Sequence, residues 1–291
     1  MPGKSVVREI SRVSRENELG HYGFFGQTWK ALRDEPADLL EYFFRTVYMT
    51  ARFLFSVNIP GLGFRDRFRL LRKIMQISLK VPGCVFPIDY LCLVEGIYST
   101  PSEGVILEVG TFMGQSTSLL SFIAAMRGQK MVTVDTFAGL PESDENPYIS
   151  PDGPGRQYIF KEGAVSSTIE EFRSNIERYG VPHAVEVIAS DIRSLAEIPL
   201  HDDRSISFCF FDVDLLSSYK GCLRAVAKQL ADEATIYLHE GALSPIRELV
   251  LDENFWHSLG IAAPKVTFPH ERFHFRTNLA ALSFVLIPKA D

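Results

Sequence analysis

Hydrophobic and polar positions divide the chain into two parts with different patterns. Residues 1–100 have a mostly helical pattern, with turns at NIPGLG and KVPGCVFP. From Gly104 onward, short continuous apolar runs alternate with longer amphipathic segments. That alternation predicts buried parallel strands separated by helices. We therefore expect a helical N-terminal extension over 1–94 and an α/β domain over 95–291.

The second part predicts a doubly wound, mostly parallel sheet with helices on both faces, a Rossmann-like α/β fold. The expected helices are 116–128, 167–180, 218–232 and 255–260. The expected strands are 104–110, 130–137, 184–191, 205–214, 234–241 and 279–289, the last one paired with the segment FHF at 273–275.

Acidic side chains end most of these strands. They are Glu108, Asp135, Asp191 and Asp212, and a fifth strand ends in His239 and Glu240. The carboxyl ends of parallel strands meet at one edge of the sheet, where ligands bind in this class of fold. We therefore expect these side chains to line one site.

The sequence LEVGTFMGQST, residues 107–117, predicts a ligand-binding turn after the first strand. Gly110 lets the chain turn off the strand, and Gly114 lets a helix and a ligand approach closely. Gln115 stands where a phosphate-binding loop needs lysine, and GTFMGQ lacks one glycine of the dinucleotide pattern. Because Glu108 would also repel phosphates, the loop favours an uncharged or cationic nucleoside.

Asp135 and Asp191 are candidates for binding the ribose and the base of a nucleoside. Asp135 ends the second strand, where an acid commonly accepts hydrogen bonds from ribose hydroxyls. The alternative for Asp135 is a cap or turn. Asp191, in ASDI, suits an adenine amino group, with Ile192 packed on the ring. The alternative for Asp191 is a surface turn.

Together these residues resemble a class I S-adenosylmethionine-dependent methyltransferase. Across about residues 100–250, the phrases VDTFAGLPE, STIEEFRSNIERYG and FFDVDLLSSYKGCLRAV are similar to the macrocin-type O-methyltransferase family. The resemblance implies a seven-stranded sheet, a homodimer, and methylation of a hydroxyl on a small molecule such as a natural product or sugar. The residues that it assigns to S-adenosylmethionine are Glu108, Gly110, Thr111, Gly114, Ser116, Asp135, Thr136, Phe137, Asp191, Ile192 and Asp212.

The resemblance also implies a divalent metal, Mg²⁺, at the ends of the fourth and fifth strands. Asp212 and Asp214 keep the two carboxylates of the family's Asp-Gly-Asp, but His239-Glu240 replaces an acidic pair. Since Mg²⁺ prefers oxygen ligands, three hypotheses stay open. His239 is a general base with little or no metal bound, or it binds a metal with Asp212 and Glu240, or all three residues are structural. In the first two, His239, Asp212 and Glu240 carry out the chemistry.

Two further functions stay open. One keeps the fold and cofactor but methylates nitrogen or directs a rearrangement without methyl transfer. The other is a non-catalytic scaffold whose basic N-terminal part docks on a partner or a membrane. Residues 1–80 hold 14 Lys/Arg against 8 Asp/Glu, whereas the whole chain has a net charge of −6. The overall negative charge argues against nucleic acid as a partner.

The apolar segment 39–59 contains Glu41, Arg45 and Arg52, which disfavour a membrane span. It predicts an amphipathic helix packed on the domain or on a second subunit. The alternative is a helix on a membrane surface, helped by the basic residues of 65–73. The N-terminus shows no secretory signal pattern and the four cysteines show no paired spacing, so we expect a reducing, cytoplasmic location.

Two loop segments are also candidates for the acceptor site. Residues 141–163 are rich in Pro, Gly, Asp and Ser, which predicts a long loop that closes over the substrate. His270 and His274 lie beside the last strand, where we expect a surface hairpin.

Overall fold

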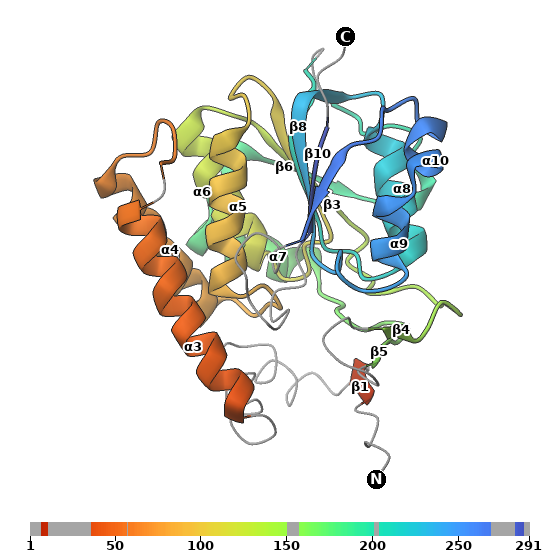
Figure 1. Cartoon of the computed structure of the whole chain (residues 1–291), viewed down its shortest axis with the longest axis horizontal. Helices are drawn as coiled ribbons and strands as arrows, with labels where there is room; N and C mark the ends of the chain where they lie inside the picture. The colour runs from red at the N-terminus through yellow and green to blue at the C-terminus, as the bar shows by residue number, and fades with distance from the viewer. Residues whose placement is uncertain are drawn as a thin grey trace.

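A seven-stranded sheet in the order β6-β3-β2-β7-β8-β10-β9 forms the centre of the molecule (Figure 1). This computed structural model describes residues 7–10, 36–56, 58–149, 157–200, 204–268 and 283–287. Strand β10 is antiparallel to β8 and β9, and the other neighbouring strands are parallel. The predicted doubly wound, mostly parallel seven-stranded sheet is therefore confirmed. The bounds are β2 Val105–Val109, β3 Met131–Asp135, β6 Val185–Ala189, β7 Ile206–Phe211, β8 Leu230–Leu238, β9 Lys265–Thr267 and β10 Ser283–Leu286.

The central strands are continuous apolar runs because both faces of the sheet are covered. All six residues of β7 are buried. In β2, Leu107 and Val109 belong to the core under α8, whereas Ile106 belongs to the core under α5 and α6. Side chains alternate along a strand, so Glu108 faces the same side as Ile106.

Helices cover the two faces of the sheet in separate groups (Figure 1). One group is α5 Pro87–Ser99, α6 Gln115–Arg127 and α7 Ile169–Tyr179. The other is α8 Leu216–Val226, α9 Ile246–Leu251 and α10 Glu253–Ser258. The sequence predicted the ends of two of them. Gly128 closes α6 in a left-handed conformation, and Thr168 caps α7 by accepting a hydrogen bond from Glu171 N.

One predicted helix is too long. The expected helix 218–232 ends at Val226, and β8 begins at Leu230. The reason is the sheet itself, because Ile206 N donates to Gln229 O over 2.7 Å and Ile206 pairs with Leu230. Backbone pairing with β7 replaces the last helical turn.

The N-terminal part is helical where it packs on α5 and α6. Helix α3 Pro36–Ala51 continues into a π-helix at Arg52–Ser56, and α4 Phe64–Lys80 follows. Arg52 forms an ion pair with Glu95 of α5, with Nη2 3.0 Å from Oε2. The predicted amphipathic helix is thus confirmed. Val7–Ile10 is an exception, since it forms strand β1 beside β5.

The expected long loop over 141–163 contains two strands. These are β4 Tyr148–Ile149 and β5 Gln157–Phe160, which form a small sheet with β1. The buried Tyr148 hydroxyl accepts a hydrogen bond from Leu216 N over 2.8 Å and donates to Glu145. The segment is therefore anchored to the start of α8.

Within the described ranges, no helix has the length and apolar character needed to cross a membrane. His270, His274 and the segment 273–275 lie outside the described residues. Among the described residues, β10 pairs with β9 at Lys265–Thr267 as well as with β8.

We expect Gly110→Ala to destabilise the fold severely. Gly110 has φ of 84°, and an added Cβ would lie 1.9 Å from the backbone oxygen of Asp212. A clash with backbone cannot be relieved by a rotamer change, so we expect a loss of at least ~4 kcal/mol in the free energy of unfolding, measured by urea titration.

Gly128→Ala is the matched control for this prediction. Gly128 also has a positive φ, of 67°, but an added Cβ would meet nothing within 4 Å. Its cost should be only the left-handed backbone strain of about 1 kcal/mol. Equal losses in the two variants would show that the approach of β2 to β7 is not the constraint.

Candidate active site

The predicted glycine loop and the predicted reactive residues meet at the point where the sheet topology reverses. The chain runs from β2 outward through β3 to β6, and from β7 outward through β8 on the other side. Gly110 follows β2 and Asp212 follows β7, and Asp212 N donates to Val109 O over 2.9 Å. Ligands of open α/β sheets bind at such a switch point.

Asp212, His239 and Glu240 form a compact polar cluster beside this point, which we call the triad. One ligand atom from each residue lies within 4.8 Å of the others. His239 Nδ1 is 3.1 Å from Asp212 Oδ1 and 2.5 Å from Glu240 Oε1. The sequence predicted that these three side chains converge, and the structure brings them together.

A tyrosine fixes the third member of the triad. The buried Tyr219 hydroxyl donates to Glu240 Oε2 over 2.5 Å and accepts from Glu240 N over 3.2 Å. Tyr219 lies on α8, so the helix that follows β7 also orients a side chain that follows β8. The Glu240 carboxylate therefore has little freedom to turn away from His239.

The charges of the triad are strongly coupled. Burial lowers the pKa of His239, but the carboxylates of Asp212 and Glu240 raise it more, so its pKa lies well above the usual value. This direction favours a protonated imidazole near neutral pH. Burial, followed by the charges of Glu240 and Asp212, raises the pKa of Asp214. Asp214 is not one of the three residues whose ligand atoms converge.

The triad has the donor atoms for a divalent metal. One imidazole nitrogen and two carboxylates suit Mn²⁺, Fe²⁺ or Zn²⁺ better than Mg²⁺, which prefers oxygen alone. A metal at His239 Nδ1 would have to displace a proton held at that nitrogen, which lies 3.1 Å from Asp212 Oδ1 and 2.5 Å from Glu240 Oε1. Metal binding by these three residues stays a prediction.

Glu108 lies beneath the glycine loop and is fully buried. Its Oε2 accepts from Thr117 Oγ1 over 2.5 Å and from Thr133 Oγ1 over 3.3 Å. Its Oε1 has no hydrogen-bond partner among the described residues. Burial raises the pKa of Glu108 to about 8, although the hydrogen bond from Thr117 opposes that effect.

Asp135 shapes the glycine loop. Its Oδ2 accepts from Thr111 N over 2.6 Å and from Phe112 N over 3.0 Å, and its Oδ1 accepts from Phe137 N over 2.7 Å. The carboxylate thus ties the turn after β3 to the turn after β2. The expected ribose contact stays a prediction. Among the described residues Oδ1 accepts one hydrogen bond and Oδ2 accepts three, so Oδ1 has more capacity to accept a hydrogen bond from a ribose hydroxyl.

Three non-glycine residues near the site have left-handed backbones. Phe112, Phe137 and Asp214 have φ of 49°, 60° and 59°, in the turns after β2, β3 and β7. Such backbones are strained for residues with side chains and are concentrated at functional sites. Here they occur at three neighbouring strand ends.

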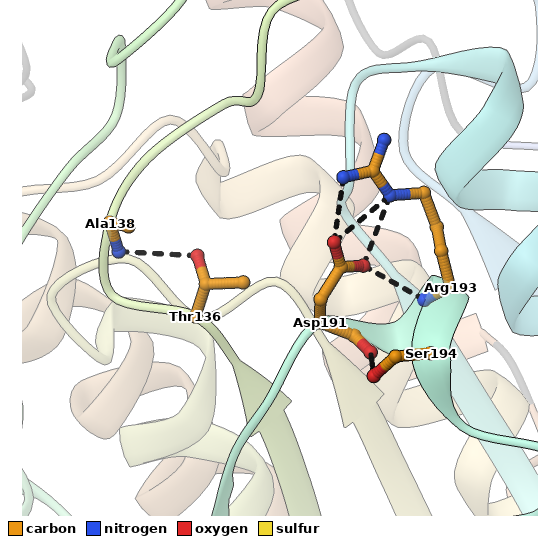
Figure 2. Close-up of polar contacts among 5 residues, drawn as sticks. All are labelled: Thr136, Ala138, Asp191, Arg193 and Ser194. Atoms are coloured by element: carbon orange, nitrogen blue, oxygen red, sulfur yellow. Dashed lines mark hydrogen bonds and ion pairs between the residues drawn. The ribbon is translucent and has the colours of Figure 1, made fainter.

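Asp191 is engaged by a neighbouring arginine (Figure 2). Its carboxylate accepts from Arg193 Nη2 over 2.6 Å and from Arg193 N over 2.8 Å, and its backbone oxygen accepts from Ser194 Oγ. Hydrogen bonds from Arg193 lower the pKa of Asp191. The neighbouring residue Ile192 is buried in the core under α8. In the turn after β3, Thr136 Oγ1 accepts a hydrogen bond from Ala138 N over 3.1 Å. An adenine contact would require Asp191 to release one of its arginine contacts.

The start of α5 adds residues that the sequence analysis missed. Asp89 is fully buried, its Oδ2 accepts from Phe86 N over 3.1 Å, and burial raises its pKa to about 6. Burial, followed by the charges of Glu108, Asp212 and Asp89, raises the pKa of Tyr90. The sequence FPIDYLCLVEG carries a signal that could have identified Asp89, because an acidic residue there stands inside an apolar helical run.

Four buried oxygen atoms near the glycine loop lack a partner among the described residues. They are Asp89 Oδ1, Tyr90 OH, Glu108 Oε1 and Gln115 Oε1. Gln115 is held against the turn before α5, because its Nε2 donates to Val81 O over 2.9 Å. Since a buried unsatisfied polar atom costs about 1–3 kcal/mol, the carboxyl and amide oxygens among them suit a ligand with N–H donors, such as the ammonium of S-adenosylmethionine, and the Tyr90 hydroxyl also has a proton to donate.

Cys84 also lies in the electrostatic field of the triad. Burial, followed by the charges of Asp212 and Asp214, raises the pKa of its thiol. The thiol is therefore protonated near neutral pH and is a poor nucleophile.

Comparison with known proteins supports the domain class. Residues 107–241 match the family model described as a methyltransferase domain, and this range contains the glycine loop, Asp135, Asp191 and the triad. A comparison with curated proteins gives no match. The narrower resemblance to macrocin-type enzymes stays a prediction.

The three solved structures named here are distant from this chain in sequence. The O-methyltransferase NovP is 12% identical, with 85% of this chain and 99% of that chain covered and a TM-score of 0.48. The calicheamicin methyltransferase CalS11 is 16% identical, with 95% of each chain covered and a TM-score of 0.45. TomG from Streptomyces achromogenes is 16% identical, with 84% and 96% covered and a TM-score of 0.42.

We expect Glu108→Gln to flatten the pH dependence of stability. The folded pKa of about 8 lies above the ordinary 4.5, so the unfolded chain loses its proton first as pH rises. Wild-type stability should therefore fall between pH ~4.5 and ~8, by on the order of 4 kcal/mol. Urea titrations across this range should show a shallower fall in Glu108→Gln, whereas the exposed control Glu177→Gln should follow the wild type. Parallel curves for all three proteins would contradict the prediction.

Proposed function

We propose that this chain transfers a methyl group from S-adenosylmethionine to a hydroxyl of a small molecule, such as a natural product or a sugar. The observation that supports this most is the meeting of the glycine loop and the triad at the switch point of the sheet. The methyltransferase-domain match over residues 107–241 supports the same class.

The cofactor would lie across the carboxyl ends of β2, β3 and β6. Glu108 and its neighbours in the loop would hold the methionine part, because the partnerless Glu108 Oε1 is an acceptor for an ammonium. Asp135 would bind ribose through Oδ1, and Asp191 would bind adenine. The other residues assigned to this cradle are Gly110, Thr111, Gly114, Ser116, Thr136, Phe137, Ile192 and Asp212.

The triad would act on the acceptor. Bound S-adenosylmethionine supplies a methyl group on a sulfonium, which is open to direct displacement, so the chain's main task is to hold the acceptor oxygen in line. The proton of that oxygen would go to the triad, where the Asp212 and Glu240 carboxylates would accept it while His239 is protonated. A metal bound by the same residues would lower the pKa of the acceptor hydroxyl.

We expect the purified protein to bind S-adenosylmethionine with a micromolar Kd in titration calorimetry. Asp135→Ala should weaken binding at least tenfold, because it removes both the ribose acceptor and the hydrogen bonds that shape residues 111–112. Glu177→Gln should bind as the wild type does, and circular dichroism should show that Asp135→Ala is folded. No binding by the wild type would contradict the proposed function.

We expect His239→Gln to reduce methyl transfer by about 10²–10⁴-fold while leaving the affinity for S-adenosylmethionine within about twofold. The measurement is transfer of radiolabelled methyl to a panel of hydroxylated small molecules, with a matched panel of amines. Unchanged transfer by His239→Gln would show that the triad is structural. Faster transfer to the amines would favour N-methylation.

The same assay tests the metal. If the triad binds a metal, then chelator treatment should abolish transfer, and Mn²⁺ should restore it better than Mg²⁺. Full activity after chelation would leave His239 and its two carboxylates as the proton-accepting group without a metal.

A further inference from the structure

The outer surface of α3 and α4 carries most of the exposed large apolar side chains in the described part of the chain. These residues form the apolar face: Phe43, Phe44, Val47, Tyr48, Phe55, Phe64, Phe68, Met75 and Leu79, each between 40% and 72% exposed. Soluble proteins rarely leave so many aromatic side chains together in water without a binding role.

The apolar face is continuous across the two helices. Arg45 and Met49 of α3 and Phe53 of the π-helix turn inward, and the apolar face lies on the opposite side. The rings of Phe55 and Phe64 are 5.8 Å apart and join it to α4. Both helices lie at one side of the molecule, outside α5 (Figure 1).

Helix α4 has three separate stripes. Leu70, Ile74 and Ile77 are buried against the domain. Phe64, Phe68, Met75 and Leu79 recur at spacings of four, seven and four and form the exposed apolar stripe. The exposed basic residues Arg65, Arg69, Arg72 and Lys80 follow the same helical period one residue further along, so they lie directly beside it.

The charge of this surface is of one sign. Over residues 43–80, every exposed charged side chain is basic, and the single acid, Asp66, is partly buried. A symmetric pairing of two copies through this face would place like charges opposite each other, without an exposed acid from the face to offset them. An anionic lipid surface offers the opposite charge together with an apolar layer.

We propose that the apolar face binds peripherally to an anionic lipid bilayer. The aromatic side chains would enter the boundary between headgroups and acyl chains, and Arg65, Arg72 and Lys80 would contact lipid phosphates. Helices α3 and α4 would lie along the bilayer without crossing it. This inference does not depend on the proposed methyl transfer.

The test is co-sedimentation of the full chain with vesicles of phosphatidylcholine alone, and with vesicles that also contain phosphatidylglycerol. We expect at least about tenfold tighter binding to the anionic vesicles, and weaker binding as salt rises from about 0.1 to about 0.5 M. No binding to either kind of vesicle, or binding that ignores lipid charge and salt, would overturn the proposal.

Two variants locate the interaction. Phe44→Ser/Phe68→Ser should bind anionic vesicles at least about tenfold more weakly, whereas Ile149→Ser/Leu251→Ser, which alters exposed apolar residues elsewhere, should bind as the wild type does. Arg65→Gln/Arg72→Gln/Lys80→Gln should lose about fivefold per residue, on the order of 10²-fold in total. Equal loss in the control variant would overturn the proposal.

Light scattering in solution tests whether a second copy of this chain, and not a bilayer, binds the apolar face. The wild type and Phe44→Ser/Phe68→Ser are expected to have the same mass at the vesicle-assay concentration, whether that is one chain of 32.8 kDa or a homodimer formed through another surface. A dimer that Phe44→Ser/Phe68→Ser converts to a monomer would assign the apolar face to a second copy instead. Unchanged circular dichroism and S-adenosylmethionine affinity in these variants would show that the fold and the proposed cofactor site are intact.

Discussion

The backbone contact between the end of β2 and the end of β7 is the constraint on which the site depends. Gly110 approaches the Asp212 carbonyl so closely that no Cβ fits between them, and Asp212 N bonds to Val109 O. Strand β2 leads into the glycine loop, and strand β7 leads to Asp212 of the triad. A shift between β2 and β7 would therefore move the proposed cofactor site and the proposed reaction site relative to each other.

Around this contact, the site is organised by buried acids rather than by bases. Glu108, Asp89 and Asp214 all have pKa values that burial raises, and two carboxylates favour the protonated form of His239. Burial makes the ionised forms of these acids unfavourable, and a cation beside them would stabilise those forms, whereas a phosphate would destabilise them further, so the site favours a cationic ligand. The absence of lysine from the glycine loop and the partnerless acceptors beneath it agree with that preference.

The helical extension serves the site through α5. Helices α3 and α4 pack on α5, and Arg52 of the π-helix pairs with Glu95. The start of α5 carries Asp89 and Tyr90 toward Glu108. The surface of α3 and α4 that faces away from α5 is the apolar face, so a ligand on that surface would act on the same layer of helices that completes the candidate site.

The sequence alone determined the parallel strands of the sheet, the glycine loop and the convergence of Asp212, His239 and Glu240, because apolar runs specify buried strands and parallel strands end at one edge. Only the tertiary structure showed that Asp135 ties two turns together, that α8 yields to β8 at Leu230, and that α5 contributes Asp89 and Tyr90. These features depend on which backbone and side-chain groups meet across distant segments. Local periodicity shows which face of a helix or strand is buried. It does not show which distant segment packs against that face, so it could not predict these contacts.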